Sequence, residues 1–480
     1  MRVPACLTAT LAVVSLGSLP AQGVGAHPSD HSPERLTELP ELWLGRLGRL
    51  RTLTTHEVEG YPWSVGGETM DRGYTVYEHW KEYVEPLGVT QVRLQSGWAR
   101  TERTRGTYEF AWLDVIVRDL VRRGVKPWIS LSYGNPLYRG GGGAGLGEAL
   151  PTSGESLAAW RKYVRAVVGR YADVVDTWEI WNEPNNLTYG SGDGPAEYGE
   201  LLILTSEAIR EIQPDATIIG FASAGHAVEW TAKTLRYLRD RDALDAIDLV
   251  SYHPYRLNPD DADAATERLR DSVARYAPDL RLYQGENGAP SEYRETKALR
   301  GHAWSERSQA KWVLRRALAD RGRGIGTSIF SIADMRYPDE VNRKGLLLTD
   351  GDGRVVRPKE AYHAVRHLAS TFGVDVVAEP AFRFRAETYH ELKAYGFRSP
   401  SGSLVALWYG GTIPSDHDDP TATNVRFEGV RFDDPVYVDL RTGVVYELPA
   451  SVWLGEGAFA GLPVYDSPVL IAERGAIRME

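Results

Sequence analysis

The chain has 480 residues, a formal net charge of −10 and one cysteine, Cys6. The acidic balance argues against nucleic acid or an anionic membrane surface as a partner. Hydrophobic residues at 42% and charged residues at 25% are typical of a globular protein, and the length suits a large barrel with a second domain.

Residues 1–26 have the pattern of a secretory signal peptide. Arg2 precedes an apolar run from Leu7 to Leu19, and small residues follow up to Ala26. We predict cleavage after Ala26 and secretion to the extracellular space or the periplasm, with no membrane attachment afterwards. An uncleaved anchor is the alternative, but the run is interrupted by polar residues and is shorter than the ~20 residues of a span. The mature chain would contain no cysteine, so disulfides and thiolate chemistry are not expected.

Strand-like and helix-like segments alternate from residue 61 to residue 372. The expected strands are residues 63–70, 90–96, 126–133, 174–182, 216–222, 247–253, 280–286 and 326–332. The expected helices are residues 74–87, 112–123, 156–171, 196–212, 227–239, 261–276, 308–320 and 358–371. Eight such units predict an α/β fold, a (β/α)8 TIM barrel. An open doubly wound sheet is the alternative, but no glycine-rich phosphate loop follows the first strand.

Residues 373–480 have a different pattern, with short alternating runs separated by turn residues. The expected strands are residues 387–397, 403–409, 425–430, 436–440, 444–448 and 468–473. This pattern predicts a C-terminal β-sandwich, which either braces the barrel or binds a ligand. Residues 27–60 are expected to be a linker or to contribute a strand to this sandwich.

Two glutamates are expected at the rim of the barrel. The fourth strand ends at Asn182-Glu183-Pro184, where proline prevents further pairing, and the seventh strand ends at Glu286. Catalytic groups of such barrels lie at the C-terminal ends of the strands. Two carboxylates, one of them protonated, can cleave a glycosidic bond, and a separation of ~5–5.5 Å would make the reaction retaining. The alternatives are a capping or loop carboxylate for Glu183 and a plain turn for Glu286.

The motif Trp-Glu-Ile-Trp-Asn-Glu-Pro-Asn at residues 178–185, with a later strand-end glutamate, resembles clan A of the glycoside hydrolases. This motif and the segments 106–114 and 344–352 are most similar to family 39, whose members include β-xylosidases and α-L-iduronidases. The resemblance covers roughly residues 60–372. It implies that Glu183 is the general acid/base, that Glu286 is the nucleophile and that Asn182 binds the 2-hydroxyl of the sugar.

Further residues are expected around this pair. His253 and Tyr255 follow the sixth strand with the same parity, and a tyrosine hydroxyl bonded to Glu286 would keep that carboxylate ionised. A buried His-Pro turn is the alternative. By the resemblance, Arg93 matches the clan's second-strand arginine and would lower the pKa of Glu286. Glu179, roughly 13 Å deeper in the fourth strand, is expected to pair with an arginine inside the barrel.

Sugar contacts are expected from Trp98, which follows the second strand, and from Tyr133 and Asn135, which follow the third. Core or loop packing is an equal alternative for each of them. Many clan members carry a tryptophan at the end of the eighth strand, but residues 328–335 contain none, which leaves the sugar unidentified.

The resemblance therefore predicts a carbohydrate as the partner, with β-D-xylosides or α-L-arabinofuranosides as first substrates. Loops at residues 138–152 and 335–346 would close one end of the cleft and favour exo action. An endo-acting glucanase or mannanase and a non-catalytic carbohydrate-binding protein are the alternatives. The histidines lack zinc-ligand spacing, and the acid, the nucleophile and water suffice, so neither a metal nor another cofactor is expected. The sequence leaves the oligomeric state open.

Overall fold

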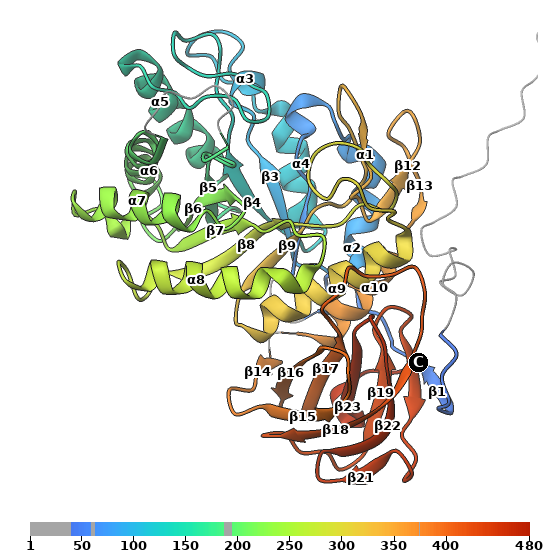
Figure 1. Cartoon of the computed structure of the whole chain (residues 1–480). Helices are drawn as coiled ribbons and strands as arrows, with labels where there is room; N and C mark the ends of the chain where they lie inside the picture. The colour runs from blue at the N-terminus through green and yellow to red at the C-terminus, as the bar shows by residue number, and fades with distance from the viewer. Residues whose placement is uncertain (1–39, 59–62, 187–193, 374) are drawn as a thin grey trace, which may run out of the picture.

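The computed structural model describes residues 40–58, 63–186, 194–373 and 375–480. The signal peptide expected at residues 1–26, and residues 27–39 and 59–60 of the expected linker, lie outside these ranges. Figure 1 shows the chain as a helix-covered barrel above a sandwich of strands. None of the described helices is long and apolar enough to cross a membrane.

Eight parallel strands close the barrel in chain order, and the last pairs with the first through Ser64 and Ser328. The strands are β2 (Ser64–Gly66), β3 (Gln91–Gln95), β4 (Lys126–Leu131), β5 (Thr177–Ile180), β6 (Thr217–Ala224), β7 (Leu249–His253), β8 (Arg281–Asn287) and β9 (Gly326–Ile329). All eight expected strands are present, so the prediction of a TIM barrel is confirmed.

Long helices cover the outside of the barrel. They are α4 (Ala111–Arg122), α5 (Gly154–Tyr171), α6 (Gly194–Arg210), α7 (Val228–Arg239), α8 (Asp263–Ala274), α9 (Glu306–Gly322) and α10 (Glu360–Thr371). In α5, Trp160, Val164 and Val167 share one face and are fully buried, as the helical spacing predicts. A capping box between Ser153 and Ser156 satisfies the first amides of this helix.

The helix expected at residues 74–87 is instead three short pieces. These are α1 (Tyr77–Trp80), a 3-10 turn at Lys81–Tyr83 and α2 (Val84–Leu87). Pro86 has no amide hydrogen for the bond to the carbonyl four residues earlier, and its ring would clash with that carbonyl in a continuous helix. A further short helix, α3 (Trp98–Thr101), follows β3.

The C-terminal sheets form a sandwich, which confirms the second part of the fold prediction. One sheet has the order β1-β20-β19-β23-β17-β16-β14 and the other β15-β18-β22-β21. The strands are β1 (Arg46–Arg49), β14 (Val377–Ala378), β15 (Arg383–Glu387), β16 (Leu392–Ser399), β17 (Gly402–Tyr409), β18 (Thr421–Glu428), β19 (Pro435–Asp439), β20 (Val444–Glu447), β21 (Trp453–Gly455), β22 (Ala458–Val464) and β23 (Val469–Glu473). β1 pairs with β20, so the segment before the barrel belongs to the larger sheet.

The strand expected at residues 387–397 is divided between the two sheets. β15 ends at Glu387 and pairs with β18, whereas β16 begins at Leu392 and pairs with β17. After the change of sheet, Phe384 and Ala386 of β15 are partly buried against the core of the sandwich, and Phe397 of β16 is fully buried.

Two hairpins extend the chain after β9. They are β10 (Met335–Arg336) with β11 (Val341–Asn342), and β12 (Leu347–Thr349) with β13 (Val355–Pro358). Lys344, which lies between the two hairpins, lines the cavity described below. The sandwich itself is joined to the barrel by buried ion pairs, among them Arg441 with Glu360 at 2.9 Å and Lys311 with Asp466 at 2.7 Å.

Candidate active site

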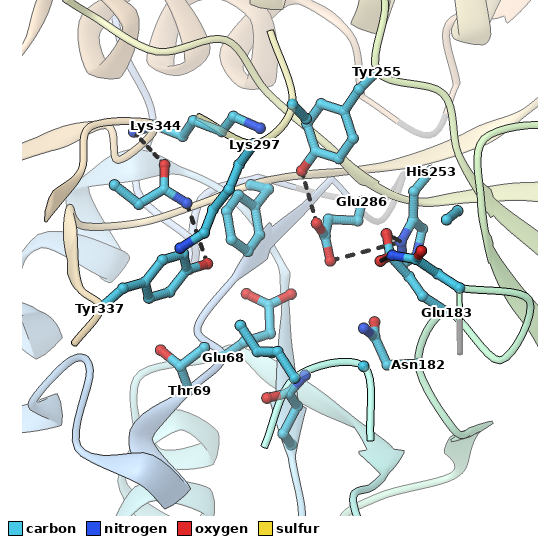
Figure 2. A pocket seen from close by; sticks show the side chains of 18 of the residues that line it. Glu68, Thr69, Asn182, Glu183, His253, Tyr255, Glu286, Lys297, Tyr337 and Lys344 are labelled. Carbon is cyan, nitrogen blue, oxygen red and sulfur yellow. Dashed lines mark hydrogen bonds and ion pairs between the residues drawn. The ribbon is translucent and has the colours of Figure 1, made fainter. Parts of the chain in front are cut away.

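A cavity of about 470 Å³ opens where the barrel strands end. Its walls include Glu183 and Glu286, together with Asn182, His253, Tyr133 and Tyr255. Figure 2 shows Tyr255 and His253 pointing toward the two glutamates from one side, and Asn182 lying below Glu183. The strand-end positions expected from the sequence therefore converge on one space.

Glu183 follows β5 in a stretch of unusual backbone. Both Trp181 and Glu183 have positive φ values, of 68° and 51°. The amide of Glu183 donates a hydrogen bond of 2.8 Å to the carbonyl of Ala222 after the chain has turned away from β5. Positive φ costs energy for residues with a Cβ, and such strain is concentrated at functional sites. The turn directs Glu183 toward the cavity, where its side chain keeps 25% of its surface exposed.

Glu286 lies on β8 and is held by three neighbours. The Tyr255 hydroxyl donates to its Oε1 at 2.7 Å, Arg93 Nη1 donates to its Oε2 at 3.0 Å, and His253 Nδ1 lies 3.8 Å from the same oxygen. Burial alone would raise the pKa of Glu286. The charges of His253 and Arg93 and the bond from Tyr255 outweigh burial and lower that pKa.

His253 connects the two glutamates. Its Nδ1 lies 3.1 Å from Oε1 of Glu183 and 3.8 Å from Oε2 of Glu286. An oxygen of each carboxyl and a nitrogen of His253 all lie within 4.8 Å of one another. Burial works against a charged imidazole, but the two carboxylates outweigh it and raise the pKa of His253. The arrangement holds two acids close together with a base between them.

Arg93 is fully buried below this pair and binds several acceptors. Its guanidinium donates to Glu179 through Nε at 3.0 Å, to Glu68 at 3.0 Å and to the side-chain oxygen of Asn182 at 2.7 Å. The expected pairing of Glu179 with an arginine inside the barrel is confirmed. Asn182 in turn donates to the Tyr133 hydroxyl at 2.7 Å, so its amide has a fixed orientation.

Two of the expected sugar contacts are not at the cavity. Trp98 is fully buried between the rings of Tyr138 and Tyr163, each with its centroid 5.6 Å away, and its indole donates to Glu102. Asn135 is also buried, and its side chain donates to the carbonyl of Glu102 at 2.8 Å. Both side chains stabilise the loops after β3 and β4. Both residues follow a strand in the sequence. That position alone does not say whether a side chain lines the cavity or packs behind it.

Several cavity residues were not anticipated from the sequence. Phe330 follows β9 and lines the wall, in the segment 328–335 that lacks the tryptophan found there in many clan members. The Lys344 ammonium lies 3.6 Å from the centre of the Tyr255 ring, and burial together with the charge of Arg294 lowers the pKa of Lys344 to about 7. Glu68 follows β2, which ends at Gly66. The strand expected at residues 63–70 extended past Glu68, so the strand-end argument used for Glu183 did not identify it. Lys344 had no sequence signal either, because a long connection carries it back to the mouth of the barrel.

Glu183, His253 and Glu286 also form the set of described residues with ligand atoms close enough for a metal ion. In this structure those atoms are engaged with one another and with Arg93 and Tyr255. Hydrogen bonding within the site therefore accounts for the cluster, and the expectation of a metal-free reaction remains a prediction.

Residues 78–279 match the family described as glycosyl hydrolases family 39. A β-xylosidase from Geobacillus stearothermophilus is 27% identical over 156 residues, which are 31% of this chain and 31% of that protein. The aligned region therefore spans about a third of the length of this curated relative.

Solved structures share the fold. A family 39 glycoside hydrolase from Bacteroides cellulosilyticus WH2 has a TM-score of 0.64 at 18% identity. The alignment covers 88% of this chain and 83% of that protein's chain. A monomeric β-xylosidase from Caulobacter crescentus CB15 has a TM-score of 0.55 at 16% identity and covers 88% and 97% of the two chains. The expected resemblance to family 39 is confirmed.

Proposed function

We propose that this family 39-like glycosidase is a retaining exo-enzyme that removes β-D-xylosyl groups from polysaccharides or oligosaccharides. In this proposal Glu183 is the general acid/base and Glu286 is the nucleophile. The observation that carries the proposal is the pair itself, whose carboxyl oxygens approach within 4.8 Å on either side of His253.

The separation favours retention over inversion. Retaining enzymes hold the two carboxyls ~5–5.5 Å apart, whereas inverting enzymes need ~6.5–9.5 Å to admit a water molecule between acid and base. A pair of glutamates as close as Glu183 and Glu286 leaves room for the anomeric carbon but not for that water in addition. A protein that only binds sugars does not need an acid and a nucleophile at this distance, so the pair also argues against the non-catalytic alternative.

The surroundings suit the two roles. Arg93, Tyr255 and His253 together lower the pKa of Glu286, so this carboxylate is ionised and able to attack the anomeric carbon. Glu183 gives its proton to the leaving oxygen, and the carboxylate so formed accepts the hydrogen bond from His253. In the second step Glu183 takes a proton from water, which attacks the glycosyl-enzyme and releases Glu286.

The choice of substrate rests on the relatives and on the shape of the mouth. The xyloside follows from the similarity to β-xylosidases. Exo action is supported by two loops that line the cavity, through Leu146 after β4 and through Tyr337 after β9. α-L-Arabinofuranosides are the second substrate to test. The signal peptide expected at residues 1–26 supports a substrate outside the cytoplasm.

Release of 4-nitrophenol from a panel of aryl glycosides tests the proposal. We expect turnover by the wild type, none by Glu286→Gly, and rescue of that variant by azide, with a glycosyl azide of inverted anomeric configuration as product. Near-normal turnover by Glu286→Gly would contradict the role of the nucleophile. Activity on long glucans or mannans alone would favour the endo alternative, and binding without turnover would favour a carbohydrate-binding protein.

A further inference from the structure

A third carboxyl, that of Glu68, faces the cavity from the end of β2. Its side chain folds back over Gly66, where a Cβ atom would collide with both carboxyl oxygens. The residue is only 1% exposed to solvent, yet it lines the cavity. Figure 2 shows its carboxyl below that of Glu286 and between Thr69 and Asn182. The absence of a side chain at Gly66 thus allows Glu68 to reach this position.

One oxygen of this carboxyl has a partner and the other has none. Oε1 accepts a bond of 3.0 Å from Arg93 Nη1, the same nitrogen that donates to Glu286 at 3.0 Å. Oε2 is buried and accepts no hydrogen bond from any described residue. Buried polar atoms are nearly always paired, because an unmade bond is costly, so an exception at a cavity wall indicates a contact that a ligand completes.

The charge balance explains how this carboxyl can exist beside the nucleophile. One guanidinium, that of Arg93, faces the carboxyls of Glu68, Glu179 and Glu286. Burial and the charge of Glu286 outweigh Arg93 and raise the pKa of Glu68 to about 7. Near neutral pH the carboxyl of Glu68 therefore carries a proton in part of the molecules, and it can donate a hydrogen bond as well as accept one.

We propose that Glu68 is a specificity-determining residue whose unpaired oxygen binds a ring hydroxyl of the sugar that is transferred to Glu286. This inference rests on the proposed function. The glycone is the group concerned because Glu68 shares a donor with the nucleophile and is almost fully buried, whereas the acid/base Glu183 is partly exposed where the leaving group departs. A neutral sugar with a free hydroxyl at this point is the ligand class that fits.

Monodeoxy substrates separate binding by Glu68 from a merely structural role. We would measure kcat/KM for the 4-nitrophenyl glycoside that the wild type turns over best, and for its monodeoxy analogues, with wild type, Glu68→Ala and Glu68→Gln. For Glu68→Ala we expect kcat/KM to fall by about 10- to 100-fold on the parent substrate. On the one analogue that lacks the bound hydroxyl, kcat/KM should change little. Glu68→Gln, which can still donate and accept, should retain more of the discrimination.

Two further variants support the interpretation. Gly66→Ala keeps the carboxylate but displaces it, so it should reproduce the pattern of Glu68→Ala. Glu78→Gln, at a surface ion pair with Lys81, should leave all substrates unchanged. Thermal unfolding of each variant shows whether the fold is intact.

An equal loss on the parent and on every analogue would mean that Glu68 only positions Arg93, and would overturn the inference while leaving the proposed function in place. Unchanged kinetics in Glu68→Ala would overturn it as well. If the wild type hydrolyses no glycoside of the panel, the proposed function fails, and the assignment of Glu68 fails with it.

Discussion

The hydroxyl of Tyr255 donates a hydrogen bond of 2.7 Å to Oε1 of Glu286. The pKa of Tyr255 is raised far above its ordinary value by burial and by the charge of Glu286, so the hydroxyl keeps its proton and remains a donor. This contact links β8 to the segment after β7 and favours the ionised form of the proposed nucleophile.

Replacing Tyr255 by phenylalanine should therefore weaken the nucleophile. We expect kcat/KM to fall by about 10- to 100-fold, the cost of one hydrogen bond to a charged group. The acidic limb of the pH profile should move to higher pH, since removal of the donor raises the pKa of Glu286. A full profile of kcat/KM against pH measures both effects. Tyr293→Phe, at a ring 58% exposed, is the matched control, and an unshifted limb in Tyr255→Phe would contradict the argument.

Glu183→Ala should slow hydrolysis to an extent that depends on the leaving group of the substrate. Without a proton donor, departure of a sugar oxygen should slow by about 10²- to 10⁴-fold, whereas a 2,4-dinitrophenolate, which needs no proton, should leave nearly as before. The measurement is kcat/KM on xylobiose and on aryl xylosides of decreasing leaving-group pKa. An equal loss on all of them would show that Glu183 is not the acid.

Lys344→Met should change the response to pH. The ammonium lies in the cavity wall and lowers the pKa of Glu286, so its removal should shift the acidic limb of kcat/KM to higher pH. Lys344 itself has a pKa of about 7, lowered by burial and by Arg294. A basic limb near pH 7 that disappears in Lys344→Met would identify its titration. Lys233→Met, on the exposed surface of α7, should leave the profile as it is.

Asp119 should stabilise the barrel in a manner that depends on pH. It accepts bonds from Tyr77 at 2.7 Å and from Arg123 at 2.8 Å. Burial raises its pKa, but the bonds from Arg123, Tyr77 and Arg122 outweigh it and lower the pKa to about 2. Because the folded pKa is depressed, the stabilisation is present above the unfolded pKa near 4 and is lost as pH falls through about 2.

Asp119→Asn should therefore cost about 2 kcal/mol in the free energy of unfolding at pH 7, and progressively less as the pH falls toward 2. Urea unfolding of both proteins across this range provides the measurement. Asp271→Asn, at an exposed position of α8, is the control. A deficit that stays constant with pH would show that the charge of Asp119 contributes nothing.

Local patterns were sufficient for the barrel strands and for the two glutamates. The helical spacing in residues 156–171 predicts a helix, and the proline after Glu183 predicts the end of a strand. Both effects involve only neighbouring residues, so they can be inferred from the sequence alone. The helix expected at residues 74–87 was wrong as a continuous element because Pro86 breaks it. The division of residues 387–397 between β15 and β16 was also missed, since local alternation does not say which sheet a strand joins.

The sequence by itself determined the fold class and the positions of Glu183 and Glu286 at strand ends, because periodicity and chain-breaking residues are local properties. Arg93, His253 and Tyr255 were also expected around the pair and contact it. Only the tertiary structure decided which further side chains line the cavity. Trp98 and Asn135 are turned into the supporting loops, whereas Glu68, Phe330 and Lys344 come from distant parts of the chain to the cavity. Closure of the barrel brings these segments together, and the burial and shared charges that shift the pKa values at the site exist only after that closure.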